Sequence, residues 1–141
     1  MTILSNYSLS FQFAGLGQRC VAAMVDGLVL NLVVIIMIFL TGVDTSSPQE
    51  GPRVLVFWIM IPWFYFTVME SSSKQGTLGK IMMNIEVTDT DGKRVSFGRA
   101  GVRTIIKMFT FGLGFLVALF TVRRQAIHDL ISGSLVIIKT E

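Results

Sequence analysis

The sequence is poor in charge, in cysteine and in histidine. Only 15% of its 141 residues are charged, while 52% are hydrophobic. A soluble domain normally carries about a quarter charged residues, so this composition argues against a soluble globular chain. The single cysteine, Cys20, excludes an intrachain disulfide framework and a thiolate metal cluster. The single histidine, His128, stands beside Asp129 without the further ligands that a metal site requires. We therefore expect no bound metal and no cofactor.

The motifs of known catalytic sites are also missing. Residues 76–80 (GTLGK) resemble a phosphate-binding loop, but the spacing is two residues short and Ile81 replaces the hydroxyl that would hold Mg²⁺. No serine stands in a nucleophile-elbow context, and one histidine does not complete a triad. No arginine-rich stripe with interleaved aromatics points to nucleic acid. We expect neither an enzyme nor a nucleic-acid partner.

Apolar residues gather instead in long runs. The first run, 20–43, is broken only by Asp26 and Asn31, and as a helix it would be about 36 Å long, enough to cross the hydrocarbon core. The second run, 54–69, is shorter and aromatic-rich, and Pro62 inside it predicts a kink that neighbouring helices can tolerate. These runs predict two transmembrane helices in a single domain that covers the chain.

A polar region follows the second run and has the pattern of strands. Residues 85–89 and 93–97 alternate in polarity around Asp91-Gly92, which predicts a β-hairpin over 84–97 outside the bilayer. The tail, 134–139, is a β-branched strand. Because short isolated strands are only marginally stable, we expect it to pair with the hairpin.

The third apolar region, 99–131, is open to two interpretations. Arg99, Arg103 and Lys107 recur at helical spacing, which predicts a basic helix face that enters the lipid headgroups. The uncharged stretch that follows is interrupted by the glycines of 112–114. It would be a single third span if Lys107 reaches back to the interface. Alternatively it is a re-entrant element broken at the glycines, with both ends on one side. Charge distribution and the unpaired tail strand favour the re-entrant form.

The charges also predict an orientation. The loop between the two spans contains only one basic residue, Arg53, whereas several follow the second span: Lys74, Lys80, Lys93, Arg94, Arg99 and Arg103. The positive-inside rule then places the N-terminus and the hairpin in the cytoplasm. We expect the chain to be an integral protein of a bacterial cytoplasmic membrane. Residues 1–18 lack the features of a signal peptide, and their aromatics suit an interfacial segment.

Ionisable residues in and near the spans are the candidate functional site. Arg19 and Asp26 are seven residues apart and share a helix face, where such groups normally meet a partner, a cavity or the interior of a bundle. They could form a topology anchor or structural ion pair, or a pair linked to transport. A supporting group completes the candidate site: Glu70, Thr77, Gly79, Lys80 and His128. Lys80 is expected either in solvent or in contact with Asp129 or Glu70.

The order and spacing of these motifs resemble the RDD family. The resemblance runs from about residue 13 to residue 139, and it rests on the following residues: Gly15, Arg19, Asp26, the run 76–80, Asp91-Gly92, Arg123-Arg124-Gln125, His128-Asp129 and Gly133. The family's named arginine and two aspartates match Arg19, Asp26 and Asp129. Ser134 stands where members usually have threonine. The resemblance implies a membrane protein, with cation/proton antiport proposed for some members and roles in larger membrane assemblies for others.

The sequence thus predicts an all-α integral membrane protein with two transmembrane helices, a glycine-broken third element and a small cytoplasmic hairpin that pairs with the tail. We expect Arg19, Asp26 and Asp129 to form one charge cluster. The favoured function is that of an accessory or structural subunit in a homo-oligomer or a larger membrane complex. The alternative is a Na⁺ or K⁺/proton antiporter that uses Asp26 and Asp129 as its titrating carboxylates.

Overall fold

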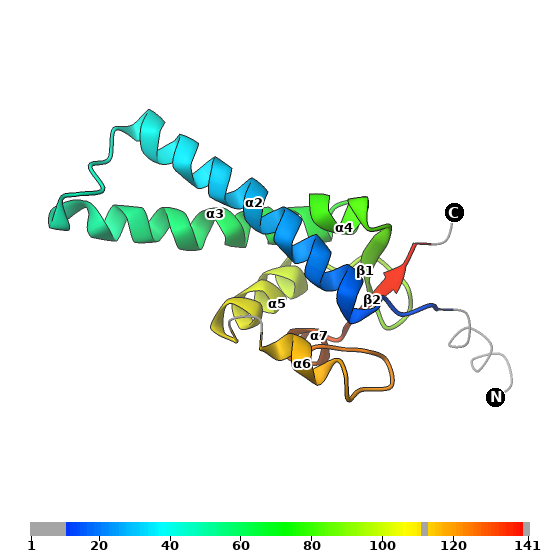
Figure 1. Cartoon of the computed structure of the whole chain (residues 1–141). Helices are drawn as coiled ribbons and strands as arrows, with labels where there is room; N and C mark the ends of the chain where they lie inside the picture. The colour runs from blue at the N-terminus through cyan, green and yellow to red at the C-terminus, as the bar shows by residue number, and fades with distance from the viewer. Residues whose placement is uncertain (1–10, 111–112, 140–141) are drawn as a thin grey trace, which may run out of the picture.

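Two long antiparallel helices project as a hairpin from a base of short helices and strands (Figure 1). The computed structural model describes residues 11–110 and 113–139, without the side chains of residues 114 and 115. The first ten residues of the predicted interfacial segment therefore lie outside the described part. In the described part, residues 12–14 lie beside a strand and α2 begins at Leu16.

The hairpin consists of α2 (Leu16–Thr41) and α3 (Gly51–Ser71), joined through the 3₁₀ turn η1 (Pro48–Glu50). Helix α2 ends at Gly42, whose φ of 65° is left-handed and suits a glycine C-cap. Helix α3 begins with proline in its first turn, where a missing N–H is harmless, and it remains helical through Pro62. Both helices are long and apolar enough to cross a membrane. Helix α2 contains the predicted run 20–43 except for its last two residues, 42 and 43. Helix α3 contains the whole predicted run 54–69.

The base begins after α3 with α4 (Leu78–Met82) and strand β1 (Ile85–Asp89), and it ends with α7 (Ile127–Ser132) and strand β2 (Ser134–Ile138). The two strands pair antiparallel, with Val87 opposite Val136. The other edge of β2 is covered by the chain just before α2, where the backbone N–H of Ala14 donates to the carbonyl of Val136. Residues 12–14, strand β1 and strand β2 thus lie side by side, with β2 in the middle.

The predicted hairpin over 84–97 is only partly correct. Its first half is β1, but the strand that pairs with β1 is the tail, and the second half makes a single bridge between Thr88 and Arg94. Ser96 explains the difference, because its hydroxyl accepts from the backbone N–H of Arg99 and starts helix α5 (Phe97–Phe109) at that point. Local alternation at 93–97 is too short to outweigh this cap.

The third apolar region forms short helices. Helix α5 is followed by α6 (Gly114–Val117) and α7, with turns between them. None of these is long enough to span, and the described part of the chain has two candidate spans rather than three. Residues 111 and 112, which include one of the glycines proposed to break this element, lie outside the described part.

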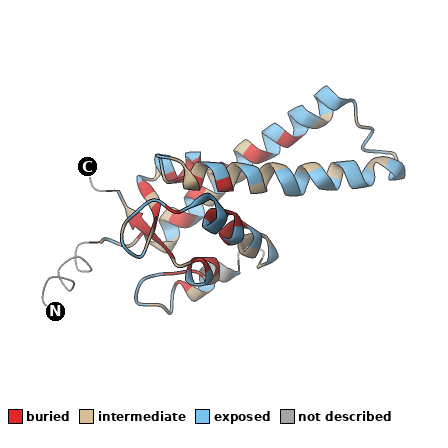
Figure 2. Ribbon diagram, turned by 180° about the vertical axis from the view of Figure 1, so that it is seen from behind, coloured by how far each residue is buried: buried red, intermediate tan, exposed pale blue. Residues whose placement is uncertain are grey.

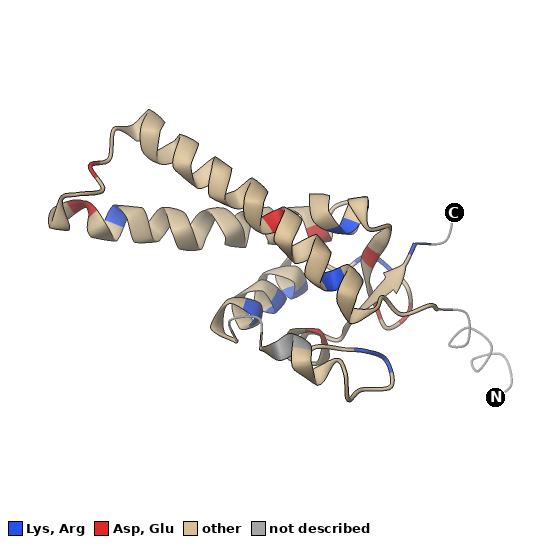
Figure 3. Cartoon of the chain, in the orientation of Figure 1, with Lys and Arg blue, Asp and Glu red and all other residues tan. Residues whose placement is uncertain are grey.

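Burial is concentrated at the base, while most of the hairpin is exposed (Figure 2). The apolar core cluster of the base is built from small side chains: Ala14, Ala22, Ile85, Val87, Val95, Ala100 and Val136. The hairpin carries few charges, and long uncharged stretches separate those of its loop end from those nearer the base (Figure 3). The core is therefore small, and polar contacts must contribute to holding the base together.

Candidate functional site

A network of buried charges joins the hairpin to the base. Asp129 is one of its centres. Its carboxylate accepts from the Arg19 guanidinium at 2.6 Å and from two nitrogens of Arg103 at 2.7 and 2.9 Å. It also accepts from the backbone N–H of Ala126 at 3.1 Å, which caps the first turn of α7. The exposed fraction of Asp129 is 0%, so these partners replace the water that it has lost.

Glu70, near the end of α3, is the second centre. It is buried and forms ion pairs with both Lys80 of α4 and Arg103 of α5. Arg103 therefore bridges two carboxylates, Glu70 and Asp129, which lie far apart in the sequence. The guanidinium of arginine suits this role because its fork of N–H groups serves two acceptors at once.

Asp26 of α2 is satisfied by hydrogen bonds rather than by an ion pair. Its carboxylate accepts from the Thr77 hydroxyl at 2.5 Å, from the Tyr65 hydroxyl at 2.8 Å and from the backbone N–H of Gly79 at 2.9 Å. A Cβ at Gly79 would lie 2.1 Å from the carbonyl oxygen of Ala22, so only glycine lets α4 approach α2 this closely. Within the run at 76–80, Thr77 and Gly79 thus bind the Asp26 carboxylate by hydrogen bonds.

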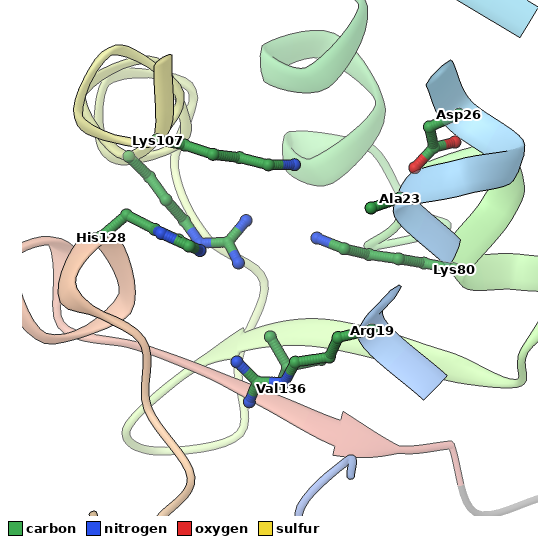
Figure 4. A pocket seen from close by; sticks show the side chains of 8 residues that line it. Arg19, Ala23, Asp26, Lys80, Lys107, His128 and Val136 are labelled. Atoms are coloured by element: carbon green, nitrogen blue, oxygen red, sulfur yellow. The ribbon is translucent and has the colours of Figure 1, made fainter. Parts of the chain in front are cut away.

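A small cavity lies among these side chains. Figure 4 shows the ends of Lys80 and Lys107 directed toward the same space, with His128 on the opposite side from Asp26 and the Arg19 guanidinium beside Val136. Its volume is about 10 Å³, roughly that of one water. The Lys107 ammonium lies 3.7 Å from the centre of the Phe66 ring, a cation–π contact. Four of the eight residues that line the cavity are basic, namely Arg19, Lys80, Arg103 and Lys107.

Burial and neighbouring charges shift the pKa values of the groups on the base. Burial lowers the pKa of Lys80 to about 7 and that of His128 to about 3. Burial alone would raise the pKa of Asp129, but the charges of Arg103 and Arg19 and the hydrogen bond from Arg103 together outweigh it and hold this pKa well below its usual range. Arg103 itself has a raised pKa because the two carboxylates outweigh its own desolvation. At neutral pH, Asp129 and Arg103 are thus charged and His128 is neutral.

The structure brings most of the predicted site together but changes the pairing. Arg19 pairs with Asp129, while Asp26 lines the same cavity and bonds to Thr77 and Gly79. Lys80 pairs with Glu70, which was one of the alternatives. His128 lies 3.6 Å from Asp129. Among the described residues, no group of three or more His, Cys, Asp and Glu is arranged to hold a metal ion.

Sequence reasoning missed the central residue, Arg103. The spacing of Arg99, Arg103 and Lys107 was visible, but it indicated a basic face toward lipid headgroups. In the structure Arg103 is buried in the network and Lys107 is half-buried, whereas Arg99 is exposed. The signal available in the sequence was the small-residue flank of Ala100 and Gly101, which lets this face of α5 pack closely against the protein.

Comparison with known proteins matches these features to a family. The sequence profile of the RDD family matches residues 13–133. The "Uncharacterized protein YxaI" of Bacillus subtilis (strain 168) is 27% identical over 89% of this chain and 97% of its own length. The "Uncharacterized protein RP437" of Rickettsia prowazekii (strain Madrid E) is 30% identical over 60% of this chain and 44% of its own length. No solved structure matches the chain.

The profile match contains every residue of the buried network, from Arg19 to Asp129. It also contains both candidate spans, α2 and α3. The chain belongs to the RDD family, and its two apolar helices indicate a membrane protein.

Proposed function

We propose that the chain is a small accessory or structural membrane subunit, acting in a homo-oligomer or in a larger membrane assembly. The observation that carries this proposal is an open apolar groove of about 720 Å³ between α3 and α5. Its lining is apolar or aromatic throughout: Leu55, Trp58, Ile59, Met60, Trp63, Ile105, Met108 and Phe109. Helices in a bilayer associate mainly by close packing, and a groove offers an entering transmembrane helix contacts on two sides.

The buried network supports a structural role. It connects α2 through Arg19, α3 through Glu70 and α7 through Asp129, with Arg103 of α5 between the two carboxylates. Removing one partner of such a network leaves an uncompensated buried charge, so the elements hold one another in a single arrangement. The two walls of the groove, α3 and α5, are joined by this network and by the bond from the Trp63 indole N–H to the carbonyl of Gly101. A preformed groove binds a partner without paying for its own ordering.

Cation/proton antiport receives less support from the same geometry. A carrier needs carboxylates that exchange their partners with the transported ion, whereas Asp129 is held by two arginines and Asp26 by three hydrogen bonds. The cavity that both groups approach has room for about one water. Within the described residues this leaves no path through the protomer, so transport would require rearrangement of the network.

Site-specific cross-linking tests the proposed function. In a Cys20→Ser background, Ile59→Cys lies in the groove and Leu40→Cys lies on the exposed face of α2 as a matched control. In native membranes at low expression, we expect Ile59→Cys to give one constant adduct, identified by mass spectrometry as a second copy or as the same membrane protein each time. Leu40→Cys should not give it. A chain that stays monomeric at both positions contradicts the proposal.

Reconstitution separates the two functions. The purified protein in liposomes should produce no proton-coupled Na⁺ or K⁺ flux. Flux that Asp26→Asn abolishes would instead support antiport, because Asp26 is a carboxylate in the cavity.

A further inference from the structure

The small sheet restricts how often the chain crosses the membrane. Strand β1 follows α3, β2 follows α7, and residues 12–14 precede α2, yet β2 is hydrogen-bonded both to β1 and to residues 12–14. Segments that share backbone hydrogen bonds lie on the same side of a bilayer. The chain from residue 14 to β1 therefore crosses an even number of times, which α2 and α3 satisfy. The chain between β1 and β2 makes no net crossing.

Helix α5, in that intervening part, has its polarity inverted relative to a surface helix of a soluble protein. Its buried residues are all polar or small: Ala100, Gly101, Arg103 and Thr104. Its large apolar side chains point outward, and Val102, Ile105 and Phe109 are 50%, 43% and 78% exposed. Water disfavours such a face, whereas the acyl-chain region of a bilayer accepts it.

The outward apolar face continues beyond α5. Large apolar side chains stay exposed through α6 and the turns after it: Leu113, Leu116, Leu119, Phe120 and Val122. Exposed basic residues stand at both ends of this stretch, with Arg94 and Arg99 before or at its beginning and Arg123 and Arg124 directly after it. Basic side chains at such positions suit the phosphate groups of lipid headgroups. The exposed apolar side chains thus suit the acyl chains of one leaflet, and the basic residues at both ends suit its headgroups.

We infer that helix α5 and residues 113–122 form an in-plane segment embedded in one leaflet, with the apolar face of α5 against acyl chains and its polar face against the buried charge network. The leaflet is the one on the side of the β1–β2 sheet. The occupant of the outward face is the lipid itself. Ile105 and Phe109 line the groove between α3 and α5 and belong to the proposed partner site, so the lipid-facing part is Val102 together with the exposed apolar side chains of residues 113–122. Lipid is favoured as its occupant because the exposed apolar side chains of α2 and α3 must also be covered by a membrane.

This placement differs from both arrangements that the sequence left open. The segment neither spans the bilayer nor folds back at its glycines after half a crossing. The network of Glu70, Arg103 and Asp129 then lies at the depth of the leaflet, shielded from lipid by α5 on one side.

Depth-dependent fluorescence quenching tests the inference. A thiol-reactive fluorophore is attached to Val102→Cys, Leu116→Cys or Leu119→Cys, three exposed positions that do not line the groove between α3 and α5, in a Cys20→Ser background. The protein is reconstituted in phospholipids brominated near the headgroup or near the chain end. Lipid brominated near the headgroup should quench all three positions more strongly. Ile35→Cys in α2, also exposed, is the control and should be quenched more by bromine near the chain end.

Three results would overturn the inference. The first is quenching by lipid brominated near the chain end that increases steadily from position 102 to position 119, which indicates a crossing. The second is no quenching by either lipid, which indicates a water-facing helix. The third is quenching that disappears as the protein-to-lipid ratio rises, which indicates that a second copy covers the face.

Sidedness provides a readout that does not depend on fluorophores in this segment. Ser72→Cys, after α3, and Lys139→Cys, after β2, should both react with a membrane-impermeant thiol reagent from the same side of sealed vesicles. Ser46→Cys, in the loop between α2 and α3, should react only from the other side. Labelling of Ser72→Cys and Lys139→Cys from opposite sides would show that the segment between them crosses.

Discussion

The hairpin and the base of this protein arrange polarity in opposite ways. Along α2 and α3, large apolar side chains are exposed and the uncharged middle of the hairpin has few buried positions. At the base, charged side chains are buried while apolar side chains of α5 face outward. The hairpin needs only length and apolarity, which many sequences satisfy. The base needs particular groups at particular distances, because a buried charge without its partner is costly.

The largest expected effect comes from removing the centre of the network. Arg103→Met would leave Glu70 and Asp129 each without its shared cation, and breaking a buried ion pair costs about 3–5 kcal/mol. We expect a correspondingly large loss of thermal stability in detergent. Arg99→Met, one turn away and exposed, is the matched control and should change stability by less than about 0.5 kcal/mol. Equal losses from the two variants would mean that the network does not stabilise the base.

Acidification should weaken the base and spare the hairpin. The pKa of His128 falls from 6.5 to about 3 on folding, mainly through burial, so the unfolded chain binds this proton more tightly. Stability should therefore fall as the pH drops below 6.5, with a slope of up to about 1.4 kcal/mol per pH unit. Thermal unfolding between pH 7 and about pH 5 measures this slope, above the range where carboxylates dominate. His128→Gln should flatten the profile, and an unchanged slope would assign the effect to another group.

The next largest loss of stability is expected from a change in the close packing of α4 on α2. Gly79→Ala would place a Cβ 2.1 Å from the carbonyl oxygen of Ala22 and disturb the bond from Gly79 to Asp26. Overpacking of this kind costs about 1–3 kcal/mol. Gly98→Ala is the control, because Gly98 is helical with nothing within 4 Å of its added Cβ. That change should be neutral or should stabilise α5 by up to about 1 kcal/mol. The prediction fails if both variants unfold at the same temperature.

The smallest expected effect is a difference between two couplings. Arg19 bonds to Asp129 at 2.6 Å, so Arg19→Ala and Asp129→Asn should be non-additive by about 0.5–3 kcal/mol. Asp26 shares the cavity but bonds to Thr77, Tyr65 and Gly79, so Arg19→Ala with Asp26→Asn should be closer to additive. A double-mutant cycle of unfolding free energies measures both. A larger coupling to Asp26 than to Asp129 would contradict the pairing in the structure.

Much of the hairpin was predictable, and the site only in part. The apolar runs at 20–43 and 54–69 predict α2 and α3 because a membrane helix is specified by composition and length. Of the three residues that match the family's named arginine and aspartates, Arg19 and Asp26 line one cavity, and Asp129 is paired with Arg19. Their pairing was not predictable, because the partner of Arg19 lies 110 residues away and depends on where α7 docks.

The sequence by itself determined where the chain is apolar, where helices must end and which residues carry charge. Those properties are local, since a run of apolar residues or a helix-capping serine acts through its neighbours in the chain. Tertiary structure decided which way each charge points. Arg103 of α5 points toward the protein because α3 and α7 place the carboxylates of Glu70 and Asp129 beside it. It also decided that β1 pairs with the tail rather than with residues 93–97, because a strand takes the partner that the packed elements bring beside it.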